Sequence, residues 1–256
     1  MARRAESSQL SLGPLLVLRG RGGKRAGAGR KRSSTLVPHT TRASFAARFP
    51  QHVTLRLARG IQLRTPALLA IVHAVMATSH RDEFRITDFN CESNHMHLVA
   101  EASGRTALAR GLQRFKSRLA RGINLGPGRR GAVFHYHHTR ALRPPREVRH
   151  VLRYVLNNAR HHAADRGRAL DPAWFDPFSS APWFTGWSTP LMPYSGWTYE
   201  LMRRAPPTAE PTVWLLAVGW RRRGRIAPRE VPGVRASRGA CRRRSGTAAA
   251  RRTGRR

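Results

Sequence analysis

The hydrophobic and polar positions along the middle of the chain follow two different periods. Alternation with period two over residues 52–58 is typical of a β-strand. Over residues 106–121, apolar side chains recur every three or four positions, which is typical of an amphipathic helix. The same periods, bounded by prolines and turn residues, predict a helix over 65–80, strands over 84–93, 95–102 and 132–142, and a helix from Pro144 and Pro145 to about His161.

The order of these elements is β-α-β-β-α-β followed by one extra helix. This order predicts an α+β fold, in which a ferredoxin-like split βαβ antiparallel sheet carries helices on one face. Gly/Arg/Ala-rich ends flank it and predict disorder, because such segments cannot bury a core. We therefore divide the chain into a basic disordered arm (1–37), a folded domain (38–165), an extension (166–236) and a basic disordered tail (237–256). The extension holds all six tryptophans, most of which we expect to be packed.

The net charge of the chain indicates the class of its binding partner. The 256 residues include 48 lysines and arginines against 13 acidic residues, a formal net charge of +35. Codon bias explains the preference for arginine over lysine but not the scarcity of acids. A polyanion explains the charge, and nucleic acid is the leading candidate. Two clusters are suited to phosphate contacts: Arg30, Lys31 and Arg32 in the arm, and Arg221, Arg222 and Arg223 at the end of a predicted amphipathic helix over 212–225. Solvated tails kept for solubility are the alternative for the ends.

Cysteine usage and apolar runs predict the compartment. Two cysteines cannot form a disulfide framework or a four-cysteine zinc site, and a reducing cytoplasm fits them. The apolar segment Leu10–Leu18 is short, contains Pro14 and precedes arginines, so it predicts neither a signal peptide nor a membrane helix. We expect a cytoplasmic, nucleoid-associated protein with no membrane partner.

Two histidines lie two positions apart in the predicted strand over 95–102. His95 and His97 leave the same face of a strand, while Met96 and Leu98 point to the other. Imidazoles on one rigid face can share a divalent ion. The pattern alone is weak evidence, because a chain with 12 histidines contains such pairs by chance.

The last predicted helix carries a tyrosine on its polar side. Tyr154 lies away from the apolar stripe and shares a face with Asn158, one turn further on. A nucleophile would be placed there, although an interfacial tyrosine is the alternative. The amide oxygen of Asn158 could join the two histidines around a hard cation, Mg²⁺ or Mn²⁺, that also binds phosphate. Without cysteine partners, we interpret the histidines at 135–138 and 161–162 as phosphate-facing or exposed rather than as a zinc site.

Several stretches together resemble a known family of enzymes. These stretches are PHTTRASFAARFPQHVTLRL (38–57), SNHMHLVAEA (93–102), LARGLQRFKSRLARGIN (108–124), YVLNNARHH (154–162), DPFSSAPWFTGW (176–187) and VWLLAVGWRRRGRIAPREVPG (213–233). They resemble the single-tyrosine HUH transposases, and most of all the REP-associated tyrosine transposases, over most of residues 38–233. The order and distance of His-hydrophobic-His relative to Tyr-x-x-x-Asn make the combination specific.

The resemblance implies a DNA strand transferase with defined site residues. His95 and His97 would be metal ligands, Tyr154 the nucleophile that forms a 5′-phosphotyrosine, and Asn158 the third, amide ligand. Family members act on single-stranded DNA near small hairpins, so we expect hairpin or palindromic DNA as the partner. One departure lies after Phe134, where the family often has an acidic-Arg-Tyr-His run and this chain lacks the arginine.

Two further hypotheses compete with this one. The chain could be a non-catalytic nucleic-acid-binding protein, or a basic protein that binds RNA or the ribosome. The sequence leaves open the target DNA, whether the protein is a monomer or a homodimer, and whether it mobilises itself.

Overall fold

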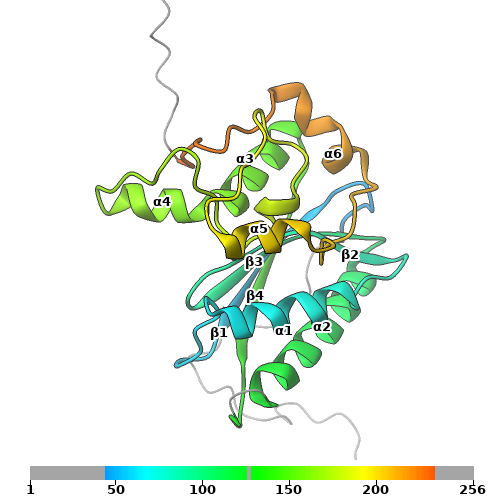
Figure 1. Ribbon diagram of the computed structural model, residues 1–256. Coiled ribbons are helices and arrows are strands. Elements are labelled where there is room, and N and C mark those ends of the chain that lie inside the picture. Colours follow the sequence, from blue (N-terminus) through cyan, green and yellow to red (C-terminus); the bar gives the residue numbers. More distant parts are fainter. Residues whose placement is uncertain (1–43, 126–127, 234–256) are drawn as a thin grey trace, which may run out of the picture. The chain divides into compact units, whose positions relative to one another are not determined.

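A computed structural model describes residues 44–125 and 128–233 of the chain (Figure 1). The predicted arm, with Arg30, Lys31 and Arg32, and the predicted tail over 237–256 lie outside the described residues. Among the helices that are described, none is both long and apolar enough to cross a bilayer.

Four antiparallel strands form one sheet at the centre of the fold. They are β1 (Gln51–Leu57), β2 (Phe84–Cys91), β3 (His95–Ala102) and β4 (Phe134–Ala141). The sheet order is β2-β3-β1-β4, and each neighbouring pair is antiparallel. Each of the two βαβ units is therefore split by an antiparallel strand, as in a ferredoxin-like sheet. The predicted α+β fold is confirmed, and the strand bounds differ from the predicted ones by two residues at most.

Two helices cover one face of this sheet, α1 (Pro66–Ala77) and α2 (Arg105–Leu125) (Figure 1). Helix α1 begins where the sequence predicts, because Thr65 accepts a hydrogen bond from the Leu68 N–H and Pro66 fits the first turn. Helix α2 approaches the sheet closely at Gly111, where a Cβ would lie 2.2 Å from the ring of Phe84. The core on this face contains Val53, Leu55, Ile86, Phe89, Met96, Leu98, Leu112, Phe115 and Leu119.

The other face of the sheet is covered by α3 (Pro145–Leu156) and by the extension (Figure 1). The prediction of one continuous helix to about His161 is wrong, because α3 ends at Leu156 and α4 (Asn158–Asp165) follows it. The break is at Asn157, whose backbone has φ −111° and ψ 21°. Its side-chain amide donates to the carbonyl oxygens of Ala227 and Glu230, so a tertiary contact overrides the local helical pattern.

The extension forms short helical turns. They are η1 (Ala181–Trp183), α5 (Gly196–Arg203), α6 (Trp214–Ala217) and η2 (Gly219–Arg223). The predicted helix over 212–225 is wrong as one element, since Val218 interrupts it with φ −135° and ψ −46°. The reason is packing: the ring of Trp214 lies against Gly219, and Trp220 is buried with its indole N–H on the Leu216 carbonyl oxygen.

Part of the extension lies along the outer edge of β2. The Cys91 N–H donates to the carbonyl oxygen of Phe178, and the Ser180 N–H donates to that of Phe89. A single β-bridge joins Asn90 to Ser179. Residues 176–180 therefore satisfy backbone groups of an edge strand that would otherwise face solvent.

Candidate active site

Two histidines of β3 project from the face of the sheet that α3 covers. Met96 and Leu98, the neighbouring residues of the strand, are buried in the core beneath α1 and α2. The alternation of a strand therefore places His95 and His97 on the opposite face. The Nε2 atoms of the two rings lie 3.0 Å apart. Both imidazoles thus direct their outer nitrogens at one position.

Hydrogen bonds to the inner nitrogens orient both rings. Nδ1 of His95 lies 2.7 Å from Oδ1 of Asn94 and donates to it, because an amide oxygen only accepts. Nδ1 of His97 lies 3.2 Å from Nε2 of His52 and 3.3 Å from Oγ1 of Thr54. With Nδ1 of His95 protonated, its Nε2 carries a lone pair. Partners of this kind fix the tautomer of metal-binding histidines.

Burial keeps these imidazoles neutral. Burial, with the neighbouring rings of His52 and His95, lowers the pKa of His97 to about 3. Burial and the positive charge of Arg140 lower the pKa of His52 to about 4, and burial also lowers the pKa of His95. Two neutral rings whose Nε2 atoms lie this close need a shared proton or a cation between them. The pair is therefore chemically suited to bind a metal ion.

Tyr154, which lies on α3, packs against histidines of the sheet. The centroid of its ring lies 5.1 Å from that of His97 and 6.3 Å from that of His52, and His161 of α4 is 6.0 Å away. Burial, with the negative charge of Glu92 nearby, raises the pKa of the phenol. A protonated phenol becomes a nucleophile when a neighbouring group accepts its proton or a cation stabilises the phenolate.

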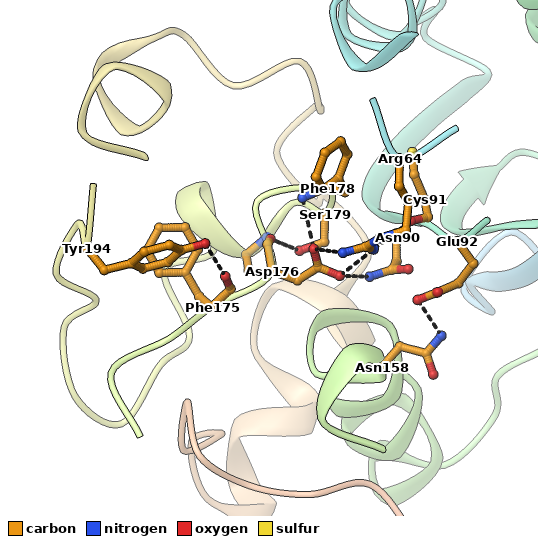
Figure 2. Close-up of polar contacts among 11 residues, drawn as sticks. Arg64, Asn90, Cys91, Glu92, Asn158, Phe175, Asp176, Phe178, Ser179 and Tyr194 are labelled. Atoms are coloured by element: carbon orange, nitrogen blue, oxygen red, sulfur yellow. Dashed lines mark hydrogen bonds and ion pairs between the residues drawn. The ribbon is translucent and has the colours of Figure 1, made fainter. Parts of the chain in front are cut away.

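Asn158 lies at the start of α4 and is fully buried. Its Nδ2 donates to Oε1 of Glu92 at 2.9 Å (Figure 2). Its Oδ1 is also buried and has no hydrogen-bond partner among the described residues. Glu92, in the hairpin between β2 and β3, thus determines which atom of the amide is left over. A buried carbonyl oxygen without a partner is costly, so this atom is suited to receive a ligand.

The donor set fits a hard divalent cation when the amide is included. Within residues 44–125 and 128–233, no group of three or more His, Cys, Asp and Glu side chains is arranged to hold a metal. Two facing imidazole nitrogens and a buried amide oxygen are ligands that Mg²⁺ or Mn²⁺ accepts beside water and phosphate. The structure brings His95, His97 and Tyr154 together, and it ties Asn158 to Glu92 at the adjacent hairpin.

Three residues of this arrangement were not predicted from the sequence. His52 and Thr54 lie on β1 opposite β3, with Thr54 paired to His97 in the register. Their signal was present in the alternation over 52–58, which places both on the face opposite the apolar residues. Glu92 carried no such signal, because its role depends on a contact 66 positions away in the sequence.

An ion pair between a half-buried arginine and a buried carboxylate fastens the extension next to this hairpin. Both terminal nitrogens of Arg64 bind the carboxylate of Asp176, each at 2.9 Å, and the amide of Asn90 donates to the same carboxylate (Figure 2). Arg64 also donates to the carbonyl oxygen of Cys91. The pair therefore holds β2 in place beside Glu92.

The predicted arginine cluster of the extension is exposed. Arg221, Arg222 and Arg223 lie on the surface of η2. The guanidinium of Arg222 stacks 5.0 Å from the centroid of Trp214, and that of Arg221 lies 5.6 Å from the centroid of Trp220. Trp214 is 48% exposed, whereas Trp220 is buried. An exposed aromatic ring beside arginines is a surface that suits unpaired bases and phosphates.

No protein-family model and no curated protein matches the chain. The solved structures that are similar to it include two of different kinds. A REP-associated tyrosine transposase bound to a REP hairpin has a TM-score of 0.44 at 19% identity, with 56% of this chain and 82% of that one covered. A bacterial tRNA(His) guanylyltransferase-like protein in complex with GTP has a TM-score of 0.38 at 9% identity, with 48% and 68% covered.

Proposed function

We propose that the chain is a DNA transposase of the HUH type, which cleaves and rejoins single-stranded DNA through Tyr154. The observation that carries the proposal is the contact between the rings of Tyr154 and His97, whose Nε2 faces that of His95. A hydrolase needs no tyrosine, whereas a strand transferase uses one to conserve the phosphodiester bond as a covalent link. The resemblance of the HMH and YVLNN stretches to the tyrosine transposases supports the same reaction.

In this mechanism the residues have separate roles. The Tyr154 oxygen attacks phosphorus, the bond from phosphorus to the 3′-oxygen breaks, and a 5′-phosphotyrosine and a free 3′-hydroxyl result. The phenolic proton passes to a neutral imidazole or water beside the ring, and the 3′-oxygen takes up a proton. His95, His97 and Asn158 would hold Mg²⁺ or Mn²⁺, which supplies polarisation of the scissile phosphate when bound. His52 and Thr54 keep His97 oriented.

The proposed substrate is single-stranded DNA that carries hairpin or palindromic elements. A chain with a net charge of +35 is suited to a phosphate backbone. Exposed Arg222 and Trp214 offer charge and a stacking surface for unpaired bases.

The test is the covalent adduct between the protein and a single-stranded oligonucleotide with Mg²⁺ or Mn²⁺. We expect Tyr154→Phe to bind the oligonucleotide as the wild type does and to form no adduct, because only the nucleophilic oxygen is lost. The matched control is Tyr136→Phe, since Tyr136 is exposed on β4 and should leave the adduct yield unchanged.

Other outcomes assign the function differently. An adduct that persists in Tyr154→Phe and disappears in Tyr136→Phe would transfer the nucleophile to Tyr136. Strong DNA binding by the wild type without any adduct would support the alternative, a non-catalytic nucleic-acid-binding protein. A preference for RNA that is indifferent to Tyr154 would support an RNA-binding role.

A further inference from the structure

A cavity lies between β2 and the extension. It has a volume of about 270 Å³, and its lining includes Asp88, Ser180, Trp183, Phe184, Glu210 and Arg221. Arg221 belongs to the exposed arginine cluster described above, and none of these residues belongs to the group formed by His95, His97, Tyr154 and Asn158. The cavity is large enough for one planar heterocycle and has both apolar and polar walls.

Asp88 is the unusual group in this wall. Its side chain is buried, and it forms no ion pair with any residue in 44–125 or 128–233. The hydroxyl of Ser180 donates to it at 3.4 Å. In a chain with 48 basic residues, a carboxyl group buried without a basic partner is notable, because burial of an unpaired charge is costly. A ligand with N–H donors would compensate that cost.

The other walls suit an aromatic ligand with a phosphate. Phe184 is held by Trp220, stacked at 5.6 Å, and by Trp187, edge to face at 5.2 Å. The indole N–H of Trp183 is engaged by the Arg204 carbonyl oxygen, which fixes that ring. Arg221 is exposed at the same cavity and can meet a phosphate, whereas Glu210 cannot.

We propose that this cavity binds one unpaired nucleobase of the DNA strand, with guanine preferred. The N1–H and N2–H groups of guanine can donate together to the two oxygens of a carboxylate, here that of Asp88. Thymine offers a single N–H between two carbonyl oxygens, so it pairs with a carboxylate poorly. That the base belongs to DNA rests on the function proposed above, but binding of the base requires no chemistry at Tyr154.

The register of the sheet relates this cavity to the candidate active site. Asp88 is paired with Val99, and Asn90 is paired with His97, so the two sites share a face of the sheet. Two residues along a strand correspond to about 7 Å. A base bound at Asp88 therefore belongs to a nucleotide within a few positions of a phosphate bound at the histidines.

The experiment measures equilibrium binding of dGMP, dAMP, dCMP and dTMP to the full chain carrying Tyr154→Phe, by calorimetry. We expect dGMP to bind about tenfold more tightly than dTMP, as one bidentate contact allows. Adding Asp88→Asn should remove this preference, because an amide presents one acceptor and one donor. Asp82→Asn is the matched control, since Asp82 is exposed and does not line the cavity, and it should keep the preference.

Three results would overturn the proposal. They are equal binding of the four nucleotides, no measurable binding at millimolar concentrations, and a preference for dGMP that survives Asp88→Asn. The adduct assay tests the proposed function separately. If the wild type forms no adduct but the preference for dGMP depends on Asp88, base binding at the cavity is supported and the strand-transferase function is rejected.

Discussion

At the scale of single residues, the candidate active site depends on hydrogen bonds that fix which atoms of His95 and Asn158 can act as ligands. Asn94 engages the inner nitrogen of His95, and Glu92 engages the amide nitrogen of Asn158. The two candidate ligand atoms are the imidazole lone pair of His95, which faces Nε2 of His97, and the amide oxygen of Asn158, which has no partner among the described residues. Both are neutral ligands, so they hold a divalent ion weakly until a phosphate joins.

The contact between Glu92 and Asn158 leads to a prediction about charge. Asn158→Ala should weaken cleavage and be partly rescued by more Mn²⁺, because water can replace an amide oxygen. Asn158→Asp alone should reduce cleavage more than Asn158→Ala does. It places a carboxylate against that of Glu92, at the point where Nδ2 of Asn158 lies 2.9 Å from Oε1 of Glu92. The double variant Glu92→Gln with Asn158→Asp should restore cleavage and tighten Mn²⁺ binding.

Titration of both cleavage and Mn²⁺ binding against metal concentration, the latter by electron paramagnetic resonance, separates these variants. His95→Ala and His97→Ala are the reference, with cleavage abolished and DNA binding kept. If Asn158→Ala, Asn158→Asp and the double variant all show the metal dependence of the wild type, Asn158 is excluded as a ligand.

Asp88 leads to a prediction about pH. Burial raises its pKa from 3.8 to about 6, and the negative charge of Glu101 adds to this. Between these values the folded chain binds more protons than the unfolded chain, so this residue makes stability fall as the pH rises. Asp88→Asn should therefore be more stable than the wild type above pH 6, by about 3 kcal/mol at most.

The difference in unfolding free energy between the two proteins, measured from pH 4 to pH 8, checks this. The gain should grow between pH 4 and pH 6 and then level off. A difference that is independent of pH would mean that Asp88 does not titrate in this range.

At the scale of elements, α2 approaches the sheet and α1 closely at two glycines. Gly111 of α2 has the ring of Phe84 where a Cβ would be, and Gly122 has the Cγ2 of Ile71 of α1 at 2.6 Å. Glycine inside a helix is usually unfavourable, so its presence here reflects the packing of α2 rather than helix propensity.

We predict that Gly111→Ala destabilises the chain by about 1–3 kcal/mol, because the added methyl group overlaps a core ring. Gly196→Ala is the control, since Gly196 begins α5 with open space around its Cβ position. Chemical denaturation compares the two. If Gly111→Ala is as stable as the wild type, α2 does not pack on Phe84 as described.

Local patterns predicted most elements, and tertiary contacts decided the rest. The strand over 52–58 and the helix over 106–121 follow from periodicity, because one face of each is buried. The break at Asn157 and the interruption at Val218 do not, since they depend on Ala227, Glu230 and a tryptophan ring. Likewise the His95 and His97 face could be predicted from alternation, whereas the partner of Asn158 could not.

At the scale of the whole molecule, charge is concentrated toward the two ends of the chain. Residues 237–256 contain eight arginines and no acidic residue. Deleting them should weaken binding to all single strands by a similar factor and flatten the dependence of affinity on salt, because fewer counterions are released. Fluorescence anisotropy with several unrelated oligonucleotides, at a series of salt concentrations, measures both effects. A loss confined to one sequence would show instead that these residues read bases.

The two outer strands of the sheet are treated differently. Beta-strand β2 is lined by residues 176–180 of the same chain, and β4 presents exposed His135, Tyr136, His138 and Arg140. An uncovered strand is a template on which other chains add and aggregate, and bulky or charged side chains oppose such addition. A fragment ending at residue 165 would lose residues 176–180, which cover the edge of β2. Only the edge at β4 would still be protected, by its bulky and charged side chains. The extension therefore acts as a built-in safeguard against aggregation, whatever else it binds.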